Sequence, residues 1–396
     1  MPSSSPDGLN VVLILIDSLR ADMPWSGYRR KIAPRLTELE RRSVSYTRAY
    51  SLSSVTARSV APLLVGKYAS EMPRNGYFFT QWYPENLFLG ERLSAAGHRA
   101  VAGHAHAYFF GNGMKQGFSD YTVLPGTIYN PPEPKPTSDR LTAAAKRLLS
   151  RNVDPSGNRR LFAYFHYMDP HHEYIEHEDA PDFGDEPRDI YDQEVWFTDQ
   201  WVGDLVSWIE KQPWGKRTAI VISADHGECF GEHGQIRHGY ELWEALVHVP
   251  LLFLVPGVAP RRVATPRSHI DLAPTLLELM GVSADPPFRG KSLLAEIRGA
   301  DDAPRPIVCD LPRDNLEDRR RAIIDGDWKL ISRGDDEKWL MYDVVRDPRE
   351  KQNLTETERD TFRRMRQLYF DLSEKIPNEE VHGDAVLKNA PPGRRW

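Results

Sequence analysis

The chain has 396 residues, of which 40% are hydrophobic and 27% are charged, with 51 Lys and Arg against 57 Asp and Glu. The apolar content excludes a disordered chain, the charge excludes a membrane bundle, and a net charge of −6 without a basic cluster argues against nucleic acid as the main partner. The apolar run at 11–16 is too short for a signal sequence or a membrane span, so we expect a cytoplasmic protein.

Three segments share one pattern, a continuous run of apolar, β-branched or aromatic residues that stops at an aspartate, at 10–17, 161–169 and 218–225. Such runs are typical of strands buried on both faces, as in a parallel sheet covered by helices. Residues with helical periodicity lie between these strands, at 33–44, 141–150 and 194–211. The alternation predicts an α/β fold with a mostly parallel sheet flanked by helices.

The aspartates that end these runs are Asp17, Asp169 and Asp225. In a doubly wound α/β sheet the carboxyl ends of the strands form the ligand crevice, so we expect the three carboxylates along one rim. For each aspartate taken alone, a turn residue or a helix N-cap is the alternative interpretation.

Beyond residues 296–306 the pattern changes to short strand candidates and one polar helix, at 305–311, 321–332, 338–345 and 356–376. This order predicts a small antiparallel sheet with a helix. We therefore predict a large α/β domain at 1–300 and a small α+β subdomain with a tail at 301–396.

The segment 225–238, DHGECFGEHGQIRH, is the richest in candidate metal ligands, and with its three glycines it contains Asp225, His226, Glu228, Glu232, His233 and His238. Carboxylate oxygens and neutral imidazoles are the ligands that divalent metals require. Because the segment directly follows a predicted buried strand, we favour a metal site over a solvated surface loop.

The segment 51–68, SLSSVTARSVAPLLVGKY, has small hydroxylated residues before an apolar stretch. Thr56 is a candidate for a helix N-terminus, where the dipole and the N–H groups favour an anion. A metal-bound threonine alkoxide would be a competent nucleophile, because a cation lowers the pKa of the hydroxyl. Arg58 would clamp a tetrahedral oxyanion through its planar fork. The alternative interpretation is that Thr56 only caps the helix and that Arg58 is exposed to solvent.

Seven segments, in this order, resemble the sulfatase-like branch of the alkaline phosphatase superfamily: NVVLILIDSLRAD, PRLTELERRSVSYTRAYS, LLVGKY, HYMDPHHEY, ADHGECFGEHG, HVPLLF and HIDLAPTLLELMGV. DGDWKLIS and MYDVVRDPREKQNL are similar to the C-terminal subdomain of that branch. The resemblance covers roughly residues 9 to 355. It implies an alkaline-phosphatase-like fold and metal-dependent cleavage or transfer of sulfate or phosphate esters through a covalent intermediate on Ser, Thr or a modified Cys.

The resemblance makes Asp17, Asp225 and His226 ligands of one metal, with the nucleophile completing its shell. Sulfatases commonly have two acidic residues at the end of the first strand. Here the second position is Ser18, which removes one carboxylate ligand.

Two residues are candidates for the nucleophile, depending on how this segment is aligned with the family. Sulfatases carry Cys or Ser followed by x-Pro-x-Arg, for conversion to formylglycine, and anchoring on Arg58 would select Ser54. Anchoring on Leu-Leu-x-Gly-Lys at 63–67 selects Thr56 without a gap and also matches phosphodiesterases and phosphoethanolamine transferases, which use threonine. We choose Thr56. Threonine is not a substrate for formylglycine formation, so this choice favours a phosphoester over an ordinary sulfatase reaction.

Several histidines match positions near the reacting group. The position of His238 is usually a lysine in sulfatases, whereas phosphoryl-transferring relatives place a histidine there, as a substrate contact or a second-metal ligand. His171 matches the histidine of the D-P-H segment and would protonate the leaving group or join Asp169 in a second metal shell. His172 is an equal candidate by position. Roles stay open for His104, His106, His172 and His233.

We therefore predict a metal-dependent hydrolase of an anionic small-molecule, glycan or lipid-head-group ester, with Thr56 as nucleophile and a phosphodiester or monoester as the favoured substrate. The alternatives are a sulfatase that uses Ser54, or a formylglycine derived from it, and a non-catalytic anion-binding member. One or two divalent ions are expected, with zinc or manganese favoured and calcium as the alternative. The organic part of the substrate is expected to contact loops near 105–140 and 172–190.

Overall fold

A computed structural model describes residues 8–125, 136–284, 288–379 and 381 of the chain. Within these ranges nine strands form the main sheet, and the predicted α/β fold is confirmed. The strand order is β10 (Arg261–Val263), β2 (Val44–Tyr50), β9 (His248–Leu254), β6 (Thr218–Ala224), β1 (Asn10–Ile16), β5 (Leu161–Tyr167), β3 (Arg99–His104) and β4 (Asp120–Val123), and β11 (Arg267–Ser268) also pairs with β2. Only β9 runs antiparallel to its neighbours in this described sheet.

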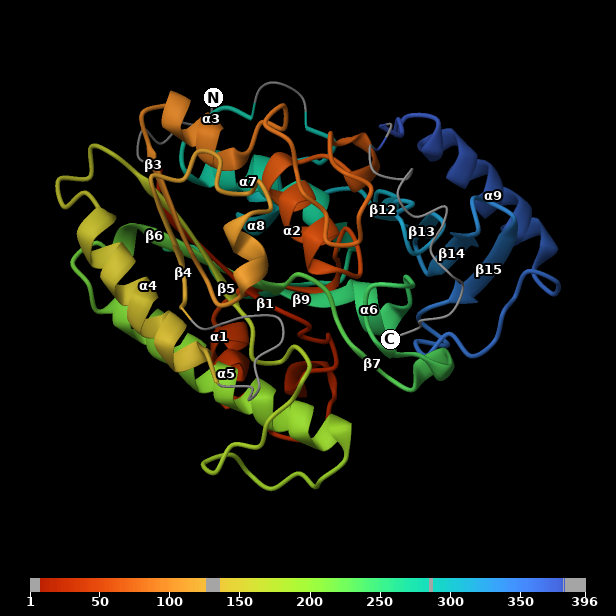
Figure 1. Ribbon diagram of the computed structural model, residues 1–396, viewed down its shortest axis with the longest axis horizontal. Helices are drawn as coiled ribbons and strands as arrows, with labels where there is room; N and C mark the ends of the chain where they lie inside the picture. The colour runs from red at the N-terminus through yellow and green to blue at the C-terminus, as the bar shows by residue number, and fades with distance from the viewer. Residues whose placement is uncertain (1–7, 126–135, 285–287, 380, 382–396) are drawn as a thin grey trace.

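Two layers of helices cover the sheet because both faces of its central strand are apolar. Val11, Leu13 and Leu15 of β1 pack in one core with α2 (Thr56–Val65), α3 (Leu89–Ala95) and α7 (Leu272–Leu279). The alternate residues Val12, Ile14 and Ile16 pack in a second core with α1 (Pro34–Arg41), α4 (Ser138–Asn152) and α5 (Pro187–Glu210). Figure 1 shows these layers above and below the sheet. Each fully buried Leu, Ile or Val contributes about 1.5–3 kcal/mol of burial free energy.

The register of the central strands brings the predicted site segments to one level. Ile16 at the end of β1 pairs with Tyr167 of β5 and with Ala224 of β6. The residues that follow, Asp17 and Asp225, therefore emerge side by side at the carboxyl edge of the sheet. This edge is where the parallel sheet of an α/β fold holds its ligands.

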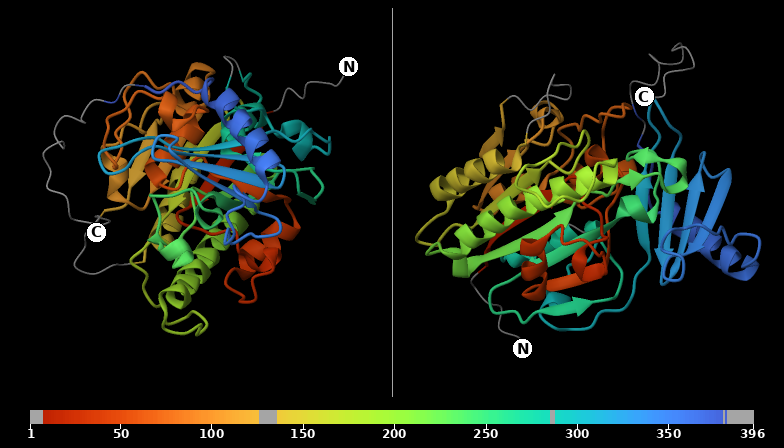
Figure 2. Two further views of the ribbon diagram at one scale, coloured as in Figure 1. Left: turned by 90° about the vertical axis from the view of Figure 1, so that its right-hand side faces the viewer. Right: turned by 90° about the horizontal axis from the view of Figure 1, so that it is seen from below.

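A second, antiparallel sheet lies at one end of the molecule (Figure 2). It contains β12 (Ile307–Leu311), β13 (Arg320–Asp325), β14 (Trp328–Arg333) and β15 (Lys338–Asp343), and α9 (Arg359–Ser373) packs against it. The prediction of a small antiparallel sheet with a helix is confirmed, while the boundary between 300 and 301 stays a prediction. The predicted tail falls largely outside the described residues.

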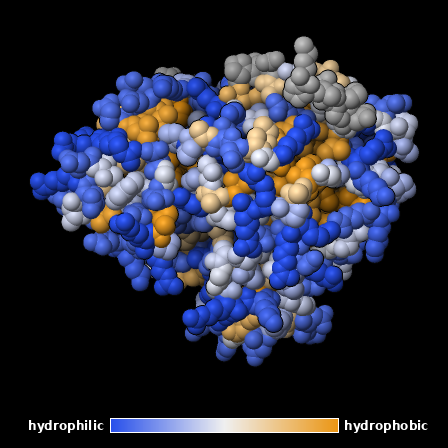
Figure 3. Space-filling model, turned by 180° about the vertical axis from the view of Figure 1, so that it is seen from behind, coloured by the Kyte–Doolittle hydropathy of each residue, from blue (hydrophilic) through white to orange (hydrophobic). Residues whose placement is uncertain are grey.

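The remaining short strands and α-helices of the described residues are β7 (Cys229–Phe230), β8 (Ile236–Arg237), α6 (Glu244–Val247) and α8 (Leu294–Ile297). The face of the molecule seen in Figure 3 is mostly hydrophilic, with separate apolar areas. None of the described helices is long and apolar enough to cross a membrane.

Candidate active site

Helix α2 presents Thr56 at its first position. Val55 before it is extended, and Gly66 ends the helix in the left-handed region with φ 75°, donating its N–H to the Pro62 carbonyl. A side chain at Gly66 would be strained in that backbone conformation. The predicted helix N-terminus at Thr56 is confirmed, and the backbone N–H groups of its first turn favour an anion there.

A cluster of oxygen and nitrogen atoms forms around the Thr56 hydroxyl. Its Oγ1 donates a hydrogen bond to Asp17 Oδ2 at 3.1 Å and lies 3.2 Å from His226 Nε2. The Nδ1 atom of His226 lies 2.9 Å from the Gly227 carbonyl, which leaves Nε2 directed at the cluster. Asp17, Asp225 and His226 are fully buried and offer ligand atoms within 4.8 Å of one another. The structure thus brings together all four residues predicted as metal ligands.

Two buried carboxylates meet in this cluster, and their pKa values move apart. Burial, followed by repulsion from Asp17, raises the pKa of Asp225. Burial opposes the ionisation of Asp17 as well, but the charge of His171 and the hydrogen bond with His166 hold the pKa of Asp17 well below its ordinary value. The Oδ2 atom of Asp225 is buried without a hydrogen-bond partner among the described residues. An orphaned carboxylate oxygen beside a second carboxylate, an imidazole and a hydroxyl fits a divalent cation.

Ser18 occupies the position at which the resemblance implied a second acidic residue, and it supports the cluster through hydrogen bonds. Its φ of 57° lies in the left-handed region, which is uncommon for a residue with a side chain. In this conformation its N–H donates to Asp225 Oδ1 at 3.3 Å and its hydroxyl donates to Asp17 Oδ1 at 3.0 Å. Ser18 therefore holds both carboxylates in place rather than adding a third.

His166 belongs to the site and was missed in the sequence. Its Nε2 lies 2.9 Å from Asp17 Oδ2, and its Nδ1 lies 2.7 Å from the Tyr164 hydroxyl, with all three residues buried. The signal in the sequence was a histidine inside the otherwise apolar run of β5. A buried polar side chain of this kind requires a partner, and here the partner is a candidate metal ligand.

Two predicted residues do not join the cluster. Arg58 is 2% exposed, and its Nη2 lies 2.6 Å from Asp314 Oδ2. Its guanidinium also lies within hydrogen-bond distance of the carbonyls of Tyr77 and Pro312, so it does not line the cavity next to Thr56. Asp169 lies two residues after the end of β5, and its carboxylate accepts hydrogen bonds from the backbone N–H groups of Thr137 and Ser138. Asp169 thus caps α4 and does not ligate beside His171.

Three further histidines surround the mouth of the cluster. His171, His172 and His238 have ligand atoms within 4.8 Å of one another. Burial lowers the pKa of His172 to about 2 and that of His238 well below its ordinary value, so both rings are neutral at physiological pH. The Nδ1 atom of His238 lies 3.1 Å from Glu228 Oε1, a carboxylate that also accepts a hydrogen bond from Tyr174.

A cavity of about 270 Å³ opens on this cluster. Asp17, Thr56 and the three histidines form its polar end, and its other walls are largely apolar and aromatic, formed by Val55, Phe78, Phe79, Tyr108, Phe109, Met168, Ile236 and Tyr240. Arg237 is the one arginine or lysine among the described residues that line it, and no ion pair with Arg237 occurs in the described part of the chain. The sequence reasoning missed Arg237, although it stands next to His238.

The predicted pocket loops contribute only in part. Tyr108 and Phe109 lie within 105–140, and His172 lies within 172–190, but Phe78 and Tyr240 come from segments that were not predicted. Residues 126–135 lie outside the described residues.

The histidines whose roles were open separate into two groups. His106 lines the cavity, whereas His104 is fully buried and stacks on Phe109. His233 stacks on Trp243 at 3.9 Å between ring centroids. We assign His104 and His233 to packing.

Comparisons with known proteins point to one protein family. A family model described as "Sulfatase" matches residues 9–282, and one described as "N-sulphoglucosamine sulphohydrolase, C-terminal" matches residues 231–379. The chain is 30% identical over 220 residues to the choline-sulfatase of Rhizobium meliloti (strain 1021), covering 53% of this chain and 41% of that protein. It is 29% identical over 168 residues to the arylsulfatase K of Mus musculus, covering 40% of this chain and 30% of that protein. The chain thus spans less than half the length of these curated relatives.

Solved structures share the whole fold. A 2-O GAG sulfatase superposes with a TM-score of 0.78 at 18% identity, covering 98% of this chain and 97% of that chain. The phosphonate monoester hydrolase of Agrobacterium radiobacter superposes with a TM-score of 0.74 at 17% identity, covering 93% and 95%. At such identities the likeness concerns the fold alone.

Proposed function

The chain belongs to the sulfatase family, and from this premise we propose that it hydrolyses sulfuric esters with a divalent metal and with Thr56 as the nucleophile. The matched family model and the curated relatives favour a sulfuric ester over the phosphoester that the sequence reasoning preferred. The choice of Thr56 over Ser54 is kept.

The position of the Thr56 hydroxyl is the observation that carries this proposal. It lies at the start of α2, in contact with Asp17 and His226, and it lines the cavity. Ser54 is fully buried, its hydroxyl has no hydrogen-bond partner among the described residues, and it does not line the cavity. A nucleophile must reach the substrate, so the geometry favours Thr56.

The residues around Thr56 suit attack on sulfur. Asp17 accepts the hydroxyl hydrogen bond and orients the oxygen, and a bound divalent ion would lower the pKa of that hydroxyl. Attack forms a bond between Thr56 Oγ1 and sulfur, and the hydroxyl proton of Thr56 passes to water. The bond between sulfur and the alcohol oxygen breaks, and that oxygen takes a proton from His171, which is reprotonated from solvent. Water then cleaves the sulfate from Thr56. Arg237, exposed at the cavity wall, attracts the anionic substrate.

The cavity walls indicate an apolar organic group. Phe78, Phe79, Tyr108 and Tyr240 surround the polar end of the cavity, and aromatic rings favour a flat apolar partner. We therefore propose an aryl or otherwise apolar alcohol as the leaving group. An aryl sulfate should be cleaved with a lower KM than a sugar sulfate.

The test compares Thr56→Ala, Thr56→Ser and Ser54→Ala on an aryl sulfate. Thr56→Ala should lower kcat/KM by about 10⁴-fold or more. Thr56→Ser, which keeps a hydroxyl, should retain part of the activity, and Ser54→Ala should behave like the wild type. Activity that survives in Thr56→Ala and disappears in Ser54→Ala would show that the nucleophile is misassigned.

A phosphoester hydrolase is the second candidate, because His238 stands where related sulfatases usually have lysine and it lies among other histidines. A panel of aryl sulfate, aryl phosphate monoester and aryl phosphodiester separates the two. Turnover confined to the phosphate esters would reject the sulfuric ester proposal in favour of this candidate.

A further inference from the structure

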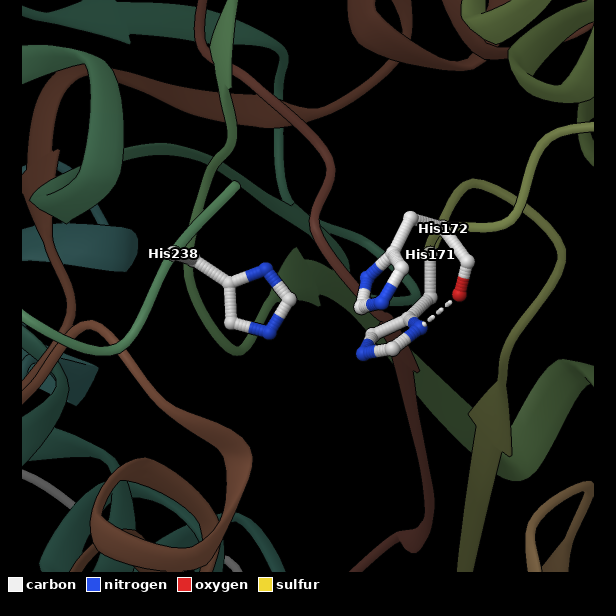
Figure 4. Close-up of side chains that lie close together, drawn as sticks. All are labelled: His171, His172 and His238. Carbon is white, nitrogen blue, oxygen red and sulfur yellow. Dashed lines mark hydrogen bonds between the residues drawn. The ribbon is translucent and has the colours of Figure 1, made fainter. Parts of the chain in front are cut away.

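The cavity has a buried polar end and an open outer end. At the polar end Asp17 is fully buried, and Figure 4 shows the rings of His171 and His172 facing that of His238, which comes from a separate segment. At the outer end Phe79 and Ile236 also line the cavity, yet they are 50% and 68% exposed. The ester bond that is cleaved belongs at the polar end, so the outer end faces the part of the alcohol farthest from that bond.

Arg237 is turned into the cavity by its backbone conformation. Ile236, Arg237 and His238 are consecutive, and all three line the cavity. Successive side chains of an extended strand point to opposite faces, so the middle residue of three should point away from the other two. Arg237 has a φ of 65°, in the left-handed region, which breaks this alternation. Strain of this kind is characteristic of functional sites, because the surrounding structure must hold the residue there.

A short hairpin holds the backbone of Arg237 in this place. Strands β7 and β8 pair antiparallel, with Cys229 opposite Arg237. Arg20 anchors the hairpin, because its Nη1 atom donates to the Glu228 carbonyl and lies 2.9 Å from Glu232 Oε1. A group that is already fixed in place loses less conformational entropy when it binds a ligand.

The guanidinium of Arg237 is exposed and forms no ion pair with any residue for which the structure gives a position. Other arginines near this segment are paired, Arg20 with Glu232 and Arg333 with Glu241. The exposure of Arg237, against the full burial of Asp17, places its charge towards the outer end of the cavity. The planar fork of an arginine matches an oxyanion through two parallel hydrogen bonds.

We propose that Arg237 determines substrate specificity by binding a second oxyanion, carried by the alcohol part of the ester at the end opposite the cleaved sulfate. This inference rests on the proposed sulfuric ester hydrolysis and narrows its substrate class to apolar sulfate esters with an additional carboxylate or sulfonate-like group. Phe78 and Tyr240, whose rings stack at 5.8 Å between centroids, contact the apolar body between the two charges. Because Arg237 is remote from the reacting bond, its contact is the same in the bound substrate and in the transition state, and it acts on KM rather than on kcat.

The test compares three aryl sulfates that differ in charge at the para position: 4-carboxyphenyl sulfate, 4-sulfophenyl sulfate and the neutral methyl ester of the first. The wild type should cleave the two charged esters with a KM about tenfold below that of the methyl ester. Arg237→Met keeps much of the side-chain length without the charge, and this preference should disappear. The KM of the methyl ester itself should rise only about two- to fivefold, because that ester loses only the general attraction of an exposed cation.

Three further variants separate binding from structural damage. Arg237→Glu should reverse the preference, so that 4-(trimethylammonio)phenyl sulfate has a lower KM than 4-carboxyphenyl sulfate; a damaged cavity would not gain a preference. Arg237→Lys keeps the charge without the planar fork and should retain part of the preference. Arg41→Met removes an exposed arginine of α1, outside the cavity lining, and should leave the order of the KM values as in the wild type.

The inference is overturned if the wild type does not distinguish 4-carboxyphenyl sulfate from its methyl ester. It is also overturned if Arg237→Met raises the KM of all three esters by one factor, since Arg237 would then bind the sulfate that is cleaved. Both results leave the proposed function standing, because the esters are cleaved.

If the wild type cleaves none of the esters, the proposed function fails, and a binding measurement decides the inference alone. The leaving alcohols 4-hydroxybenzoate and methyl 4-hydroxybenzoate are titrated into the full chain and followed by calorimetry. Tighter binding of 4-hydroxybenzoate that is lost in Arg237→Met supports a specificity site for an oxyanion. Equal binding of the two alcohols, or a preference that survives in Arg237→Met, overturns it.

Discussion

Replacing Arg58 by methionine tests whether this arginine stabilises the fold or contacts the substrate. Methionine keeps much of the side-chain length and removes the charge. The guanidinium of Arg58 lies 2.6 Å from the carboxylate of Asp314, and each side chain is 2% exposed. The substitution therefore leaves the Asp314 carboxylate buried without its cation.

The expected loss follows from that burial. Breaking a buried ion pair by removing one partner costs about 3–5 kcal/mol, because the remaining charge stays out of water. The hydrogen bonds from Arg58 to the carbonyls of Tyr77 and Pro312 are lost as well. The double variant Arg58→Met with Asp314→Leu removes both charges and should recover most of the loss.

Urea unfolding followed by tryptophan fluorescence measures the free energy of unfolding, and turnover of an aryl sulfate without urea measures catalysis. Arg58→Met should be strongly destabilised, while its folded fraction retains a kcat within about tenfold of the wild type. Arg237→Met is the matched control: an exposed arginine is lost, so stability should hardly change, while KM should rise. If Arg58→Met lost less than about 1 kcal/mol of stability but more than about 100-fold in kcat/KM, Arg58 would act on the substrate and the structural reasoning would be wrong.

Three other changes have defined outcomes. His166→Phe removes a buried hydrogen-bond partner of the Asp17 carboxylate. This change should lower the free energy of unfolding by about 1–3 kcal/mol and weaken metal binding next to Asp17 about 10- to 100-fold. A metal affinity that calorimetry finds unchanged would contradict this expectation. Burial opposes ionisation of Asp310, but the neighbouring Arg321 holds the pKa of Asp310 below 3.8 in the folded protein. The ionised carboxylate therefore stabilises the fold above about pH 4. This stabilisation disappears as the pH falls through the lower pKa of the folded state. Asp310→Asn should therefore be less stable than the wild type at pH 7 and approach it at low pH, and a pH-independent difference in urea unfolding would refute the assignment. Removal of divalent metal with a chelator should lower Tm, because an ion that binds only the folded protein stabilises it, and adding metal back should restore the Tm. A Tm insensitive to the chelator would argue against the metal site.

The main layers of the fold were predictable because burial on both faces leaves a clear pattern. The runs at 10–17, 161–169 and 218–225 became β1, β5 and β6. The aspartate follows directly after β1 and β6, and it follows two residues after the end of β5. The direction of β9 was not predictable in the same way, because a continuous apolar run carries no signal for parallel or antiparallel pairing.

The position of a site residue was predictable where that residue directly follows the end of a strand. It was not predictable where the direction of the side chain depends on a helix face or on a partner far away in the sequence. Asp17 and Asp225 follow from register alone. Arg58 comes two residues after Thr56, and since an α-helix turns about 100° per residue, its side chain points away from that of Thr56 once the helix begins there. Asp169 finds its partner in Thr137, 32 residues earlier in the chain, a distance over which no local pattern extends.

The C-terminal sheet also reaches the helix that begins at Thr56. Asp314, in the connection between β12 and β13, holds Arg58 of the helix that begins at Thr56, and the neighbouring Asn315 accepts a hydrogen bond from the backbone of Phe78, a wall of the cavity. A chain cut after residue 300 would retain Thr56 and lose both anchors. Substitutions of Asp314 or Asn315 would therefore change the reaction rate by displacing α2 and the cavity wall. Selection for activity would then act on residues that do not contact the substrate.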